Sequence, residues 1–275
     1  MMSLNPFPKT FQEVVGLIPA GGLGTRISPL PCSKELYPVG FMRHGNTDEI
    51  RPKVVCEYLL EKMKFANIKK IYLVLRKGKW DIPSYLGDGS SLNINLAYLL
   101  MNHPYGAPFT VDQAYPFVKD SLVALGFPDI IFKPKDAFAK LIEKQSKSGA
   151  DIVLGLFETD QPQHADMVKF DQAGRVYDIL IKPKSTDLTF AWIIAVWTPV
   201  FTEFMHECLK QMLNEKRERD EILKIDRELF VGDIINKAIA DNLSIQSLVF
   251  ENKKFLDIGI PSNLINAISK IVTKI

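Results

Sequence analysis

The sequence has few cysteines, and they are not spaced as disulfide or zinc frameworks are. Cys32, Cys56 and Cys208 are odd in number and lie far apart in a chain of 275 residues. Small secreted domains rely on paired cysteines, whereas a chain of this length can bury a large apolar core without covalent cross-links. We therefore expect the three cysteines to be reduced thiols, as in a cytoplasmic protein.

Long apolar runs and a large excess of charge are also lacking. No run reaches the roughly 20 residues that a membrane-spanning helix needs. Residues 1–12 carry no secretory apolar segment and are expected to form a loose lead-in. The formal net charge is +2, which is too small for an electrostatic nucleic-acid binder. The sequence therefore predicts neither a membrane nor a nucleic-acid partner.

Internal repeats, low-complexity tracts and flexible linkers are absent, so we expect one domain over residues 1–275. Apolar runs at 14–18 and 71–75 flank a predicted helix over 53–66 that Pro52 opens, as in a βαβ unit with parallel strands. Strand and helix patterns continue to alternate along the chain, which is typical of an α/β fold. Further strands are predicted at 92–100, 121–132, 152–157, 191–197 and 244–250, a hairpin at 167–179, and helices at 137–147 (with Asp136 as N-cap), 198–215 and 262–274.

What the sequence does have is a glycine-rich segment directly after the first predicted strand. It reads AGGLGTR from Ala20 to Arg26, and Lys34 follows. Glycine lets the backbone turn sharply and lets an anion approach its N–H groups, while the two side chains add positive charge. The segment therefore predicts a phosphate-binding loop. Its spacing fits neither a Walker loop nor a G-x-G-x-x-G dinucleotide fingerprint. An ordinary strand-to-helix turn with two incidental surface cations is the alternative.

The order of these residues resembles the signature loop of the sugar-1-phosphate nucleotidyltransferases, or NDP-sugar pyrophosphorylases, a family that includes the glucose-1-phosphate thymidylyltransferases. The similarity continues through KEL at 34–36 to Pro38, and returns in LGDGS at 86–90, VKFDQAGRV at 168–176 and LDIG at 256–259. It covers nearly the whole chain, from Val14 to about Ala267. The resemblance implies a Rossmann-like mixed, mostly parallel sheet sandwiched by helices, as in nucleotide-diphospho-sugar transferases.

The activity that the resemblance implies is nucleotidyl transfer, in which a sugar 1-phosphate attacks the α-phosphate of a nucleoside triphosphate and pyrophosphate leaves. Arg26 and Lys34 would act on the phosphates, Lys182 would bind the sugar phosphate, and Asp129 and Asp257 would hold Mg²⁺. We expect the two carboxylates to converge on one cleft at the mouth of the glycine-rich loop. A homo-oligomer is left open. The expected nucleotide-binding residues are Ala20, Gly21, Gly22, Gly24, Thr25 and Gly106.

Two of these residues have plain alternatives. Asp129 is the single carboxylate in the apolar segment 121–132, where it is costly unless it is paired or metal-bound. A cap on the turn before Lys133 is the other interpretation. Lys182 stands where relatives carry the lysine of an E-K-P motif. The alternative interpretation is that Lys182 is an ordinary exposed lysine without a role in binding.

Three positions depart from the family pattern. Met101 stands where many relatives have a base-reading glutamine, and Ile181 stands where they have a glutamate that holds sugar hydroxyls. At the third place relatives often have a small glycine beside the sugar, whereas this chain has the bulkier Ile193 and Ile194. Met101 cannot make the paired hydrogen bonds of an amide, so we interpret it as a core filler. The departures predict an acceptor with fewer hydroxyl contacts than glucose 1-phosphate. They leave open a transferase for an alditol phosphate or phosphocholine, and a non-catalytic protein that binds a nucleotide or NDP-sugar.

Overall fold

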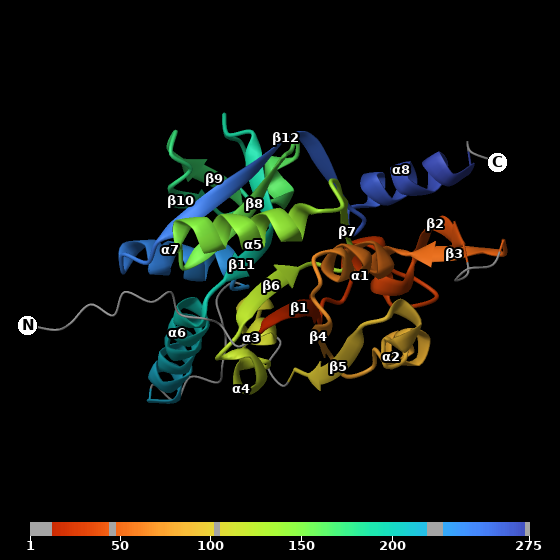
Figure 1. Ribbon diagram of the computed structural model, residues 1–275, viewed down its shortest axis with the longest axis horizontal. Coiled ribbons are helices and arrows are strands. Elements are labelled where there is room, and N and C mark those ends of the chain that lie inside the picture. Colours follow the sequence, from red (N-terminus) through yellow and green to blue (C-terminus); the bar gives the residue numbers. More distant parts are fainter. Residues whose placement is uncertain (1–12, 44–47, 102–104, 219–227, 273–275) are drawn as a thin grey trace, which may run out of the picture.

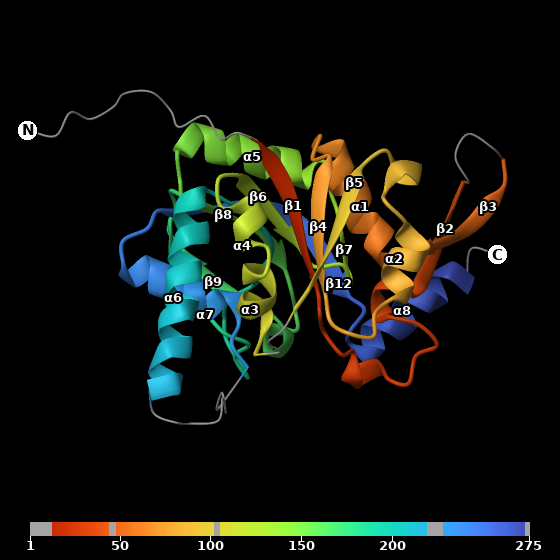
Figure 2. The ribbon, with the colours of Figure 1, turned by 90° about the horizontal axis from the view of Figure 1, so that it is seen from below.

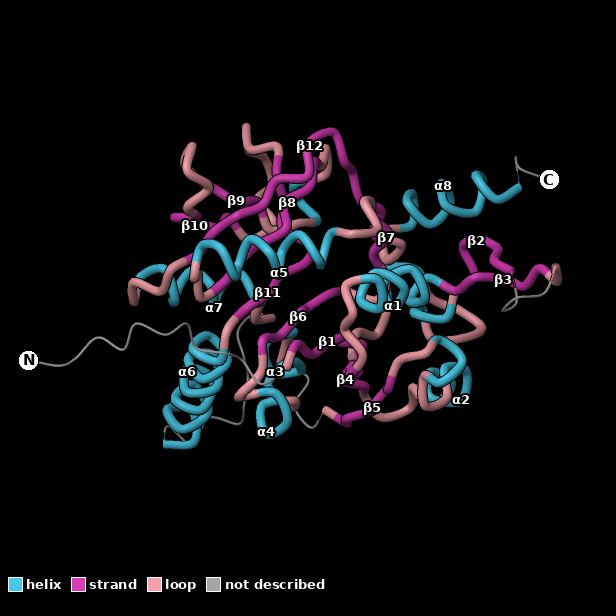
Figure 3. The backbone as a smooth tube through the Cα atoms, viewed as in Figure 1, coloured by secondary structure: helices cyan, strands magenta, loops and turns pink. Residues whose placement is uncertain are grey.

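The computed structural model describes residues 13–43, 48–101, 105–218 and 228–272. One large sheet runs through the molecule and carries helices on both faces (Figures 1 and 3). The lead-in expected at 1–12 and the charge-rich residues 219–227 lie outside the described residues. Of the helices that are described, none is both long enough and apolar enough to cross a membrane.

The large sheet has ten strands and mixes parallel with antiparallel pairs. Its order is β5-β4-β1-β6-β11-β8-β12-β7, and the antiparallel hairpin β9–β10 joins it through β11. The first four strands are parallel to one another, whereas β11 runs antiparallel to both β6 and β8. The mixed, helix-covered sheet predicted from the sequence is therefore confirmed. The strands are β1 (Val14–Ala20), β4 (Lys70–Leu75), β5 (Asn95–Leu100), β6 (Leu122–Gly126), β7 (Ile130–Phe132), β8 (Ile152–Glu158), β9 (Met167–Phe170), β10 (Val176–Leu180), β11 (Phe190–Trp197) and β12 (Ile245–Asp257).

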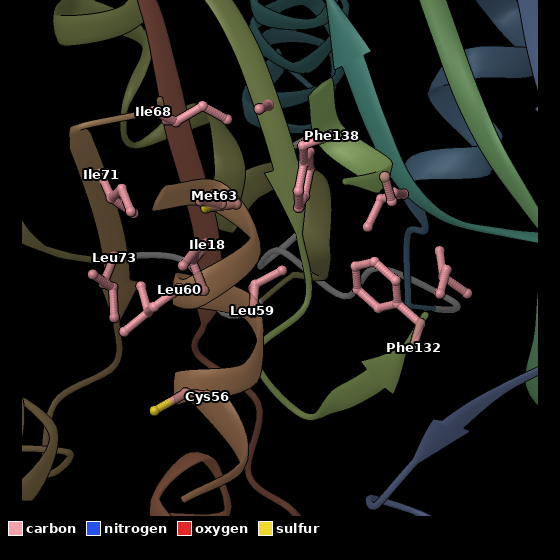
Figure 4. Packing of buried hydrophobic residues seen from close by; sticks show 14 of the residues in the cluster. Ile18, Cys56, Leu59, Leu60, Met63, Ile68, Ile71, Leu73, Phe132 and Phe138 are labelled. Carbon is pink, nitrogen blue, oxygen red and sulfur yellow. The ribbon is translucent and has the colours of Figure 1, made fainter. Parts of the chain in front are cut away.

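Two groups of helices cover the two faces (Figure 2). The first is α1 (Val55–Phe65) with α5 (Ala137–Ser148), and the second is α3 (Ala107–Asp112), α4 (Tyr115–Val118), α6 (Pro199–Glu218) and α7 (Val231–Ala240). On the first face, Leu59 and Met63 of α1 lie against Ile18 of β1 (Figure 4). A side chain at Gly16 of β1 would place its Cβ 2.9 Å from the Met63 sulfur, so this helix packs directly on the strand backbone.

The predicted βαβ unit is present, but its helix begins later than expected. Pro52 lies inside β3 (Ile50–Val54), which pairs with β2 (Pro38–Arg43) in a separate two-stranded sheet next to α1 and α8 (Pro261–Val272). Proline is tolerated there because a strand in a two-stranded sheet leaves half of its N–H groups unpaired. The helix therefore starts at Val55 rather than at residue 53.

Three other predictions need correction. The run at 121–132 forms two strands, since Pro128 breaks it and β7 pairs with β12 instead. Asp136 precedes α5, yet its side chain bonds Lys140 and caps no backbone N–H. The strand expected at 92–100 begins only at Asn95, and a short helix without a predicted counterpart, α2 (Asp81–Leu86), precedes it. The other predicted strands and helices lie within a few residues of their expected bounds, except that β12 runs on to Asp257 from an expected end at residue 250. The three cysteines are free thiols, as expected.

Candidate active site

A cavity of about 620 Å³ opens at the carboxyl ends of the four parallel strands. Met101 follows β5, Arg76 follows β4, Gly21 follows β1, and Phe127 and Asp129 follow β6; all five line the cavity. This edge is where open α/β sheets hold their ligands, because the loops that leave parallel strands diverge there. The other half of the sheet supplies the opposite wall, which includes Asp166, Lys182, Trp192, Phe230 and Asp257.

The glycine-rich loop wraps over the side chain of Lys34. A Cβ on Gly22 would lie 3.5 Å from the Lys34 ammonium, and one on Gly24 would lie 3.4 Å from its stem. Gly24 has a φ of 67°, a left-handed conformation that glycine adopts without strain. Of the expected nucleotide-binding residues in this loop, Gly21 and Gly22 line the cavity and Ala20, Gly24 and Thr25 do not. Ala20 is buried in β1.

Lys34 and Asp129 form an ion pair of 2.5 Å at the cavity wall. Lys34 begins a short 3-10 helix, η2 (Lys34–Leu36), and Asp129 lies in the turn between β6 and β7. Burial lowers the pKa of the Lys34 ammonium. The nearby carboxylates of Asp129, Glu35 and Asp257 outweigh burial, so the pKa lies above its usual value. Burial also favours a neutral Asp129, yet the lysine outweighs it and the pKa of Asp129 is lowered. The pair therefore stays ionised near neutral pH.

Two anchors hold η2 in place, one on either side of Lys34. Asp81 of α2 accepts hydrogen bonds from the Ser33 backbone and hydroxyl, each at 2.7 Å. Lys79 donates to Glu35 at 2.6 Å, and both of these side chains are buried. Sequence reasoning missed these anchors because they come from the segment after β4, whose approach to the loop is a property of the fold.

Asp257 meets Asp129 and Arg26 around one glycine. A Cβ on Gly259 would lie 2.9 Å from Asp257 Oδ1, 3.2 Å from Arg26 Nη2 and 3.4 Å from Asp129 Oδ2. The Arg26 guanidinium is 3.7 Å from Asp257 Oδ2, and the Gly259 N–H donates to Oδ1 at 2.7 Å. The expectation that the two carboxylates converge beside the glycine-rich loop is therefore confirmed. Arg26 reaches this cluster from the 3-10 helix η1 (Thr25–Ile27) but is not among the residues that line the cavity.

The two carboxylates would suit a divalent cation. Burial, followed by repulsion from Asp129, raises the pKa of Asp257 to about 6. A cation between them would relieve this repulsion, and oxygen atoms are the ligands that Mg²⁺ prefers. Among the described residues no cluster of three or more His, Cys, Asp or Glu side chains could hold a metal alone. Further oxygen ligands would have to come from substrate phosphates and water.

Lys182 lies across the cavity, on the far wall. Its ammonium sits 3.7 Å from the centre of the Phe230 ring, and its backbone has a φ of 40°, which is uncommon for a lysine. Burial lowers its pKa, while Asp166 and Glu228 act in the opposite direction. Lys182 lines the cavity, yet it is an exposed residue, as the plain alternative expects, so its contact with the acceptor phosphate stays a prediction.

Gly106 brings the segment before α7 to the cavity. It forms a parallel bridge with Leu229, and its φ of 122° is open to glycine alone. A side chain at Gly106 would overlap the Leu229 carbonyl oxygen. The bridge places Glu228 and Phe230 at the cavity wall.

The three departures from the family pattern are not equivalent in the structure. Met101 packs partly buried against the core but also lines the cavity, where its side chain would overlap a Cβ on Gly21, so filling the core is only part of its role. Ile194 is buried away from the cavity, whereas its neighbour Ile193 lines it. Ile181 points toward Gly232 of α7 and is not a lining residue.

Asp166 and Trp192 are cavity residues that the sequence interpretation did not single out. Asp166 lies directly before β9, and its carbonyl oxygen accepts a hydrogen bond of 3.3 Å from the Trp192 backbone N–H in β11. The signal for Asp166 was available, because a carboxylate beside the apolar pair Met167–Val168 resembles Asp129 beside Ile130–Ile131. The tryptophan carries no comparable signal in a strand that is apolar throughout.

Comparison with known proteins gives a consistent result. The family model described as "Nucleotidyl transferase" matches residues 15–274. The chain is 27% identical over 255 residues, or 92% of its length, to the low-salt glycan biosynthesis nucleotidyltransferase Agl11 of Haloferax volcanii. It is 29% identical over 181 residues, or 64% of its length, to a glucose-1-phosphate thymidylyltransferase of Mycolicibacterium smegmatis. The matches span 64% and 58% of these relatives, so the chain covers less than two thirds of their length.

A solved structure shows the same fold. It is a crystal structure, with sucrose, of a Bacillus anthracis protein provisionally assigned as a glucose-1-phosphate thymidylyltransferase. The TM-score is 0.75 at 19% identity, and the match covers 94% of this chain and 95% of that one.

Proposed function

This chain belongs to the nucleotidyl transferase family, and from that premise we propose that it transfers a nucleotidyl group from a nucleoside triphosphate to a sugar 1-phosphate, forming an NDP-sugar and releasing pyrophosphate. The observation that carries the proposal is the meeting of the Lys34–Asp129 pair with Arg26 and Asp257 beside the glycine-rich loop. Charged groups of both signs are concentrated there at the mouth of a cavity large enough for a nucleotide.

The reaction asks the protein mainly to position two phosphates and to balance their charge. The N–H groups of Gly21 and Gly22 would bind the triphosphate, since they line the cavity at the end of β1. Arg26 would stabilise the leaving pyrophosphate, and Lys34 would approach the phosphate at which the bond changes. Lys182 faces them from the opposite wall and would hold the phosphate of the incoming acceptor.

Asp129 and Asp257 would hold Mg²⁺, which supplies positive charge to the triphosphate oxygens when it is bound. Their convergence and the raised pKa of Asp257 support this assignment. Lys34 already balances the charge of Asp129. When a phosphate binds, the Lys34 ammonium would contact both Asp129 and the phosphate. Gly106 would offer its backbone to the nucleotide beside Met101.

The proposal is tested by measuring pyrophosphate release. Each of ATP, CTP, GTP, UTP and dTTP is combined with glucose 1-phosphate, other hexose 1-phosphates, an alditol phosphate and phosphocholine, in the presence of Mg²⁺. We expect release that needs both substrates and that is greatest with a hexose 1-phosphate. Lys34→Met is the inactive control, because it removes the charge at the phosphate loop and rules out a contaminating enzyme.

Two results would contradict the proposal. Release that is greatest with phosphocholine or an alditol phosphate would assign a different acceptor class. Tight triphosphate binding without release for any pair would indicate a non-catalytic nucleotide-binding protein.

A further inference from the structure

Three neighbouring strands end together at the cavity, and the residue that follows each of them lines it. Strands β1, β4 and β5 pair in parallel and end at the same register position. The next residues along the three strands are Gly21, Arg76 and Met101, and all three line the cavity. The Met101 N–H donates to the Leu75 carbonyl oxygen at 2.8 Å, so the pairing of β5 with β4 continues to this point. Arg76 therefore lies between the glycine-rich loop and Met101.

Arg76 is a half-buried cation whose donors are not used by the protein itself. Arg26 and Arg51 each pair with a carboxylate, whereas the Arg76 side chain makes neither an ion pair nor a hydrogen bond with any residue that the structure describes. The acidic side chain nearest along this wall, Glu35, is already balanced by Lys79. A guanidinium placed at a cavity in this way has its hydrogen bonds available for a ligand.

The order of the strands separates Arg76 from the groups that face the phosphates. Lys34 meets Asp129, which follows β6, so the phosphate-binding groups lie between β1 and β6. In the order β5-β4-β1-β6, Arg76 lies on the other side of β1. A triphosphate held by the glycine-rich loop, with its acceptor on the facing wall at Lys182, therefore extends its nucleoside over the ends of β4 and β5.

Met101 gives this part of the cavity an apolar surface in a fixed position. Its sulfur accepts a hydrogen bond of 3.6 Å from the Thr110 hydroxyl and occupies the space that a side chain on Gly21 would need. A thioether can contact the flat face of a base, but it cannot pair with the polar edge as an amide does. Arg76 is the charged side chain beside it that can pair with the edge.

The chemistry of a guanidinium selects the pattern of that edge. It only donates hydrogen bonds, and its fork matches two adjacent acceptors. Guanine presents O6 beside N7, and cytosine presents O2 beside N3. Uracil and thymine carry an N3–H between their two carbonyl oxygens, and adenine carries its amino group beside N1 and N7. Each of these three bases would set a donor against the fork. An amide, with one donor and one acceptor side by side, would match uracil and thymine instead.

We propose that Arg76 reads the base of the donor nucleotide and selects guanine or cytosine over uracil, thymine and adenine. The inference rests on the proposed function, because it takes the glycine-rich loop as the triphosphate site. The shared feature of the two selected bases is a pair of adjacent acceptors, to which Arg76 donates two hydrogen bonds while Met101 contacts the base face. Arg76 is a specificity-determining residue and takes no part in the transfer step.

The test is calorimetric binding of nucleoside triphosphates with Mg²⁺ and without an acceptor. The probes are ATP, CTP, GTP, UTP and dTTP, tripolyphosphate, which lacks a base, and 7-deaza-GTP and 3-deaza-CTP, which each lack one of the two adjacent acceptors. The proteins are the wild type, Arg76→Met, which keeps an unbranched stem without donors, and Arg76→Gln, which stays polar and repeats the measurement if Arg76→Met does not fold. The control is Lys77→Met, which removes the exposed charge of the next residue, outside the cavity lining.

We expect GTP or CTP to bind the wild type about 10–100-fold more tightly than UTP, dTTP and ATP, since a bidentate arginine discriminates between bases by this order. The deaza analogue of the preferred nucleotide should bind about 10-fold or more weakly, which distinguishes guanine from cytosine. In both Arg76 variants the preference should fall to within about threefold. Their affinity for tripolyphosphate should stay unchanged, and Lys77→Met should behave as the wild type.

Four outcomes would overturn the inference. They are tightest binding of UTP, dTTP or ATP to the wild type, equal binding of all five triphosphates, a deaza analogue that binds as tightly as its parent, and a preference that survives in both Arg76 variants. An equal loss for every nucleotide and for tripolyphosphate would make Arg76 a phosphate ligand and would overturn it as well.

The proposed function can fail separately from this inference. If GTP or CTP binds with a preference that depends on Arg76 but no acceptor yields pyrophosphate, the proposed function fails and the reading of the base stands. If pyrophosphate release is greatest with UTP or dTTP and is unchanged in Arg76→Met, the function stands and Arg76 does not read the base.

Discussion

Lys34 illustrates how a single residue keeps its charge in a largely enclosed site. Its stem lies under the backbone of Gly22 and Gly24, and its ammonium meets Asp129. Burial alone would favour the neutral amine, but the surrounding carboxylates outweigh burial and raise its pKa. A cation fixed in this way costs little reorganisation when phosphate charge develops next to it, which is how preorganised charges accelerate transfer.

The first prediction concerns Arg26, whose guanidinium is half exposed and lies 3.7 Å from Asp257. Arg26→Ala should lower kcat about 100-fold or more, comparable to the loss of one preorganised donor. The free energy of unfolding should change by less than about 1 kcal/mol, because the ion pair is partly exposed. Arg43→Ala, which removes an exposed arginine from β2, is the matched control. Near-normal pyrophosphate release by Arg26→Ala would remove Arg26 from the mechanism.

The second prediction follows from the raised pKa of Asp166. Its folded value is about 6, against roughly 3.9 for an unperturbed aspartate. The protonated form is therefore favoured in the folded protein, so the protein loses stability as pH rises through this interval. Asparagine cannot ionise and escapes that loss. Asp166→Asn should be more stable than the wild type by about 1–3 kcal/mol at pH 8, and the difference should shrink toward zero near pH 4.

Urea unfolding followed by circular dichroism at several pH values measures this difference. Asp160→Asn is the control, because its exposed carboxylate has a pKa lowered by Lys254 and the effect should be small and of opposite sign. A difference that is the same at pH 4 and pH 8 would show that Asp166 is not a buried, unbalanced carboxylate.

At the scale of elements, the bridge between Gly106 and Leu229 fixes one side of the cavity. Gly106→Ala would place a Cβ on the Leu229 carbonyl oxygen at a φ that disfavours side chains. We expect a loss of more than about 2 kcal/mol of stability and a clear loss of triphosphate affinity, since the segment before α7 must move. Gly149→Ala is a matched control with a φ of 65° and open space around it, so only the backbone cost of about 1 kcal/mol applies.

Chemical denaturation and calorimetric titration of both variants check this third prediction. Equal losses in the two variants would mean that the backbone conformation alone matters. The bridge to Leu229 would then have no part in shaping the site.

The elements that sequence reasoning recovered are those whose signal is local. The apolar runs of β1, β4 and β8 are buried on both faces, so their composition alone identifies them. The β2–β3 hairpin was not predicted, because Pro52 is equally typical of a helix start and of an edge strand. In the site, a glycine cluster and lone carboxylates are visible in a sequence. The neighbours that Asp166, Glu35 and Lys79 acquire depend on which loops the fold brings together.

At the scale of the molecule, the cavity joins two halves of one sheet. Its phosphate-loop wall follows the parallel strands, and its other wall follows β9, β11 and β12. The long β12 pairs with β8 at its start and with β7 at its end, so it carries Asp257 from the second half to the first (Figure 1). A ligand held by both walls should therefore stabilise the whole fold and not one half of it.

The last prediction uses this linkage. A ligand that binds only the folded state at 100 times its Kd adds about 2.7 kcal/mol of stability. A nucleoside triphosphate with Mg²⁺ should raise the free energy of unfolding more than the same triphosphate in EDTA, because Mg²⁺ relieves the repulsion between Asp129 and Asp257. Asp257→Asn should lose the Mg²⁺-dependent increment and keep the increment from the triphosphate alone, with Asp160→Asn as the unaffected control. Each increment is measured by urea unfolding against the same variant without ligand. If Asp257→Asn retained the full Mg²⁺-dependent increment, Asp257 would not be a ligand of the cation, and the raised pKa of Asp257 would reflect burial and Asp129 alone.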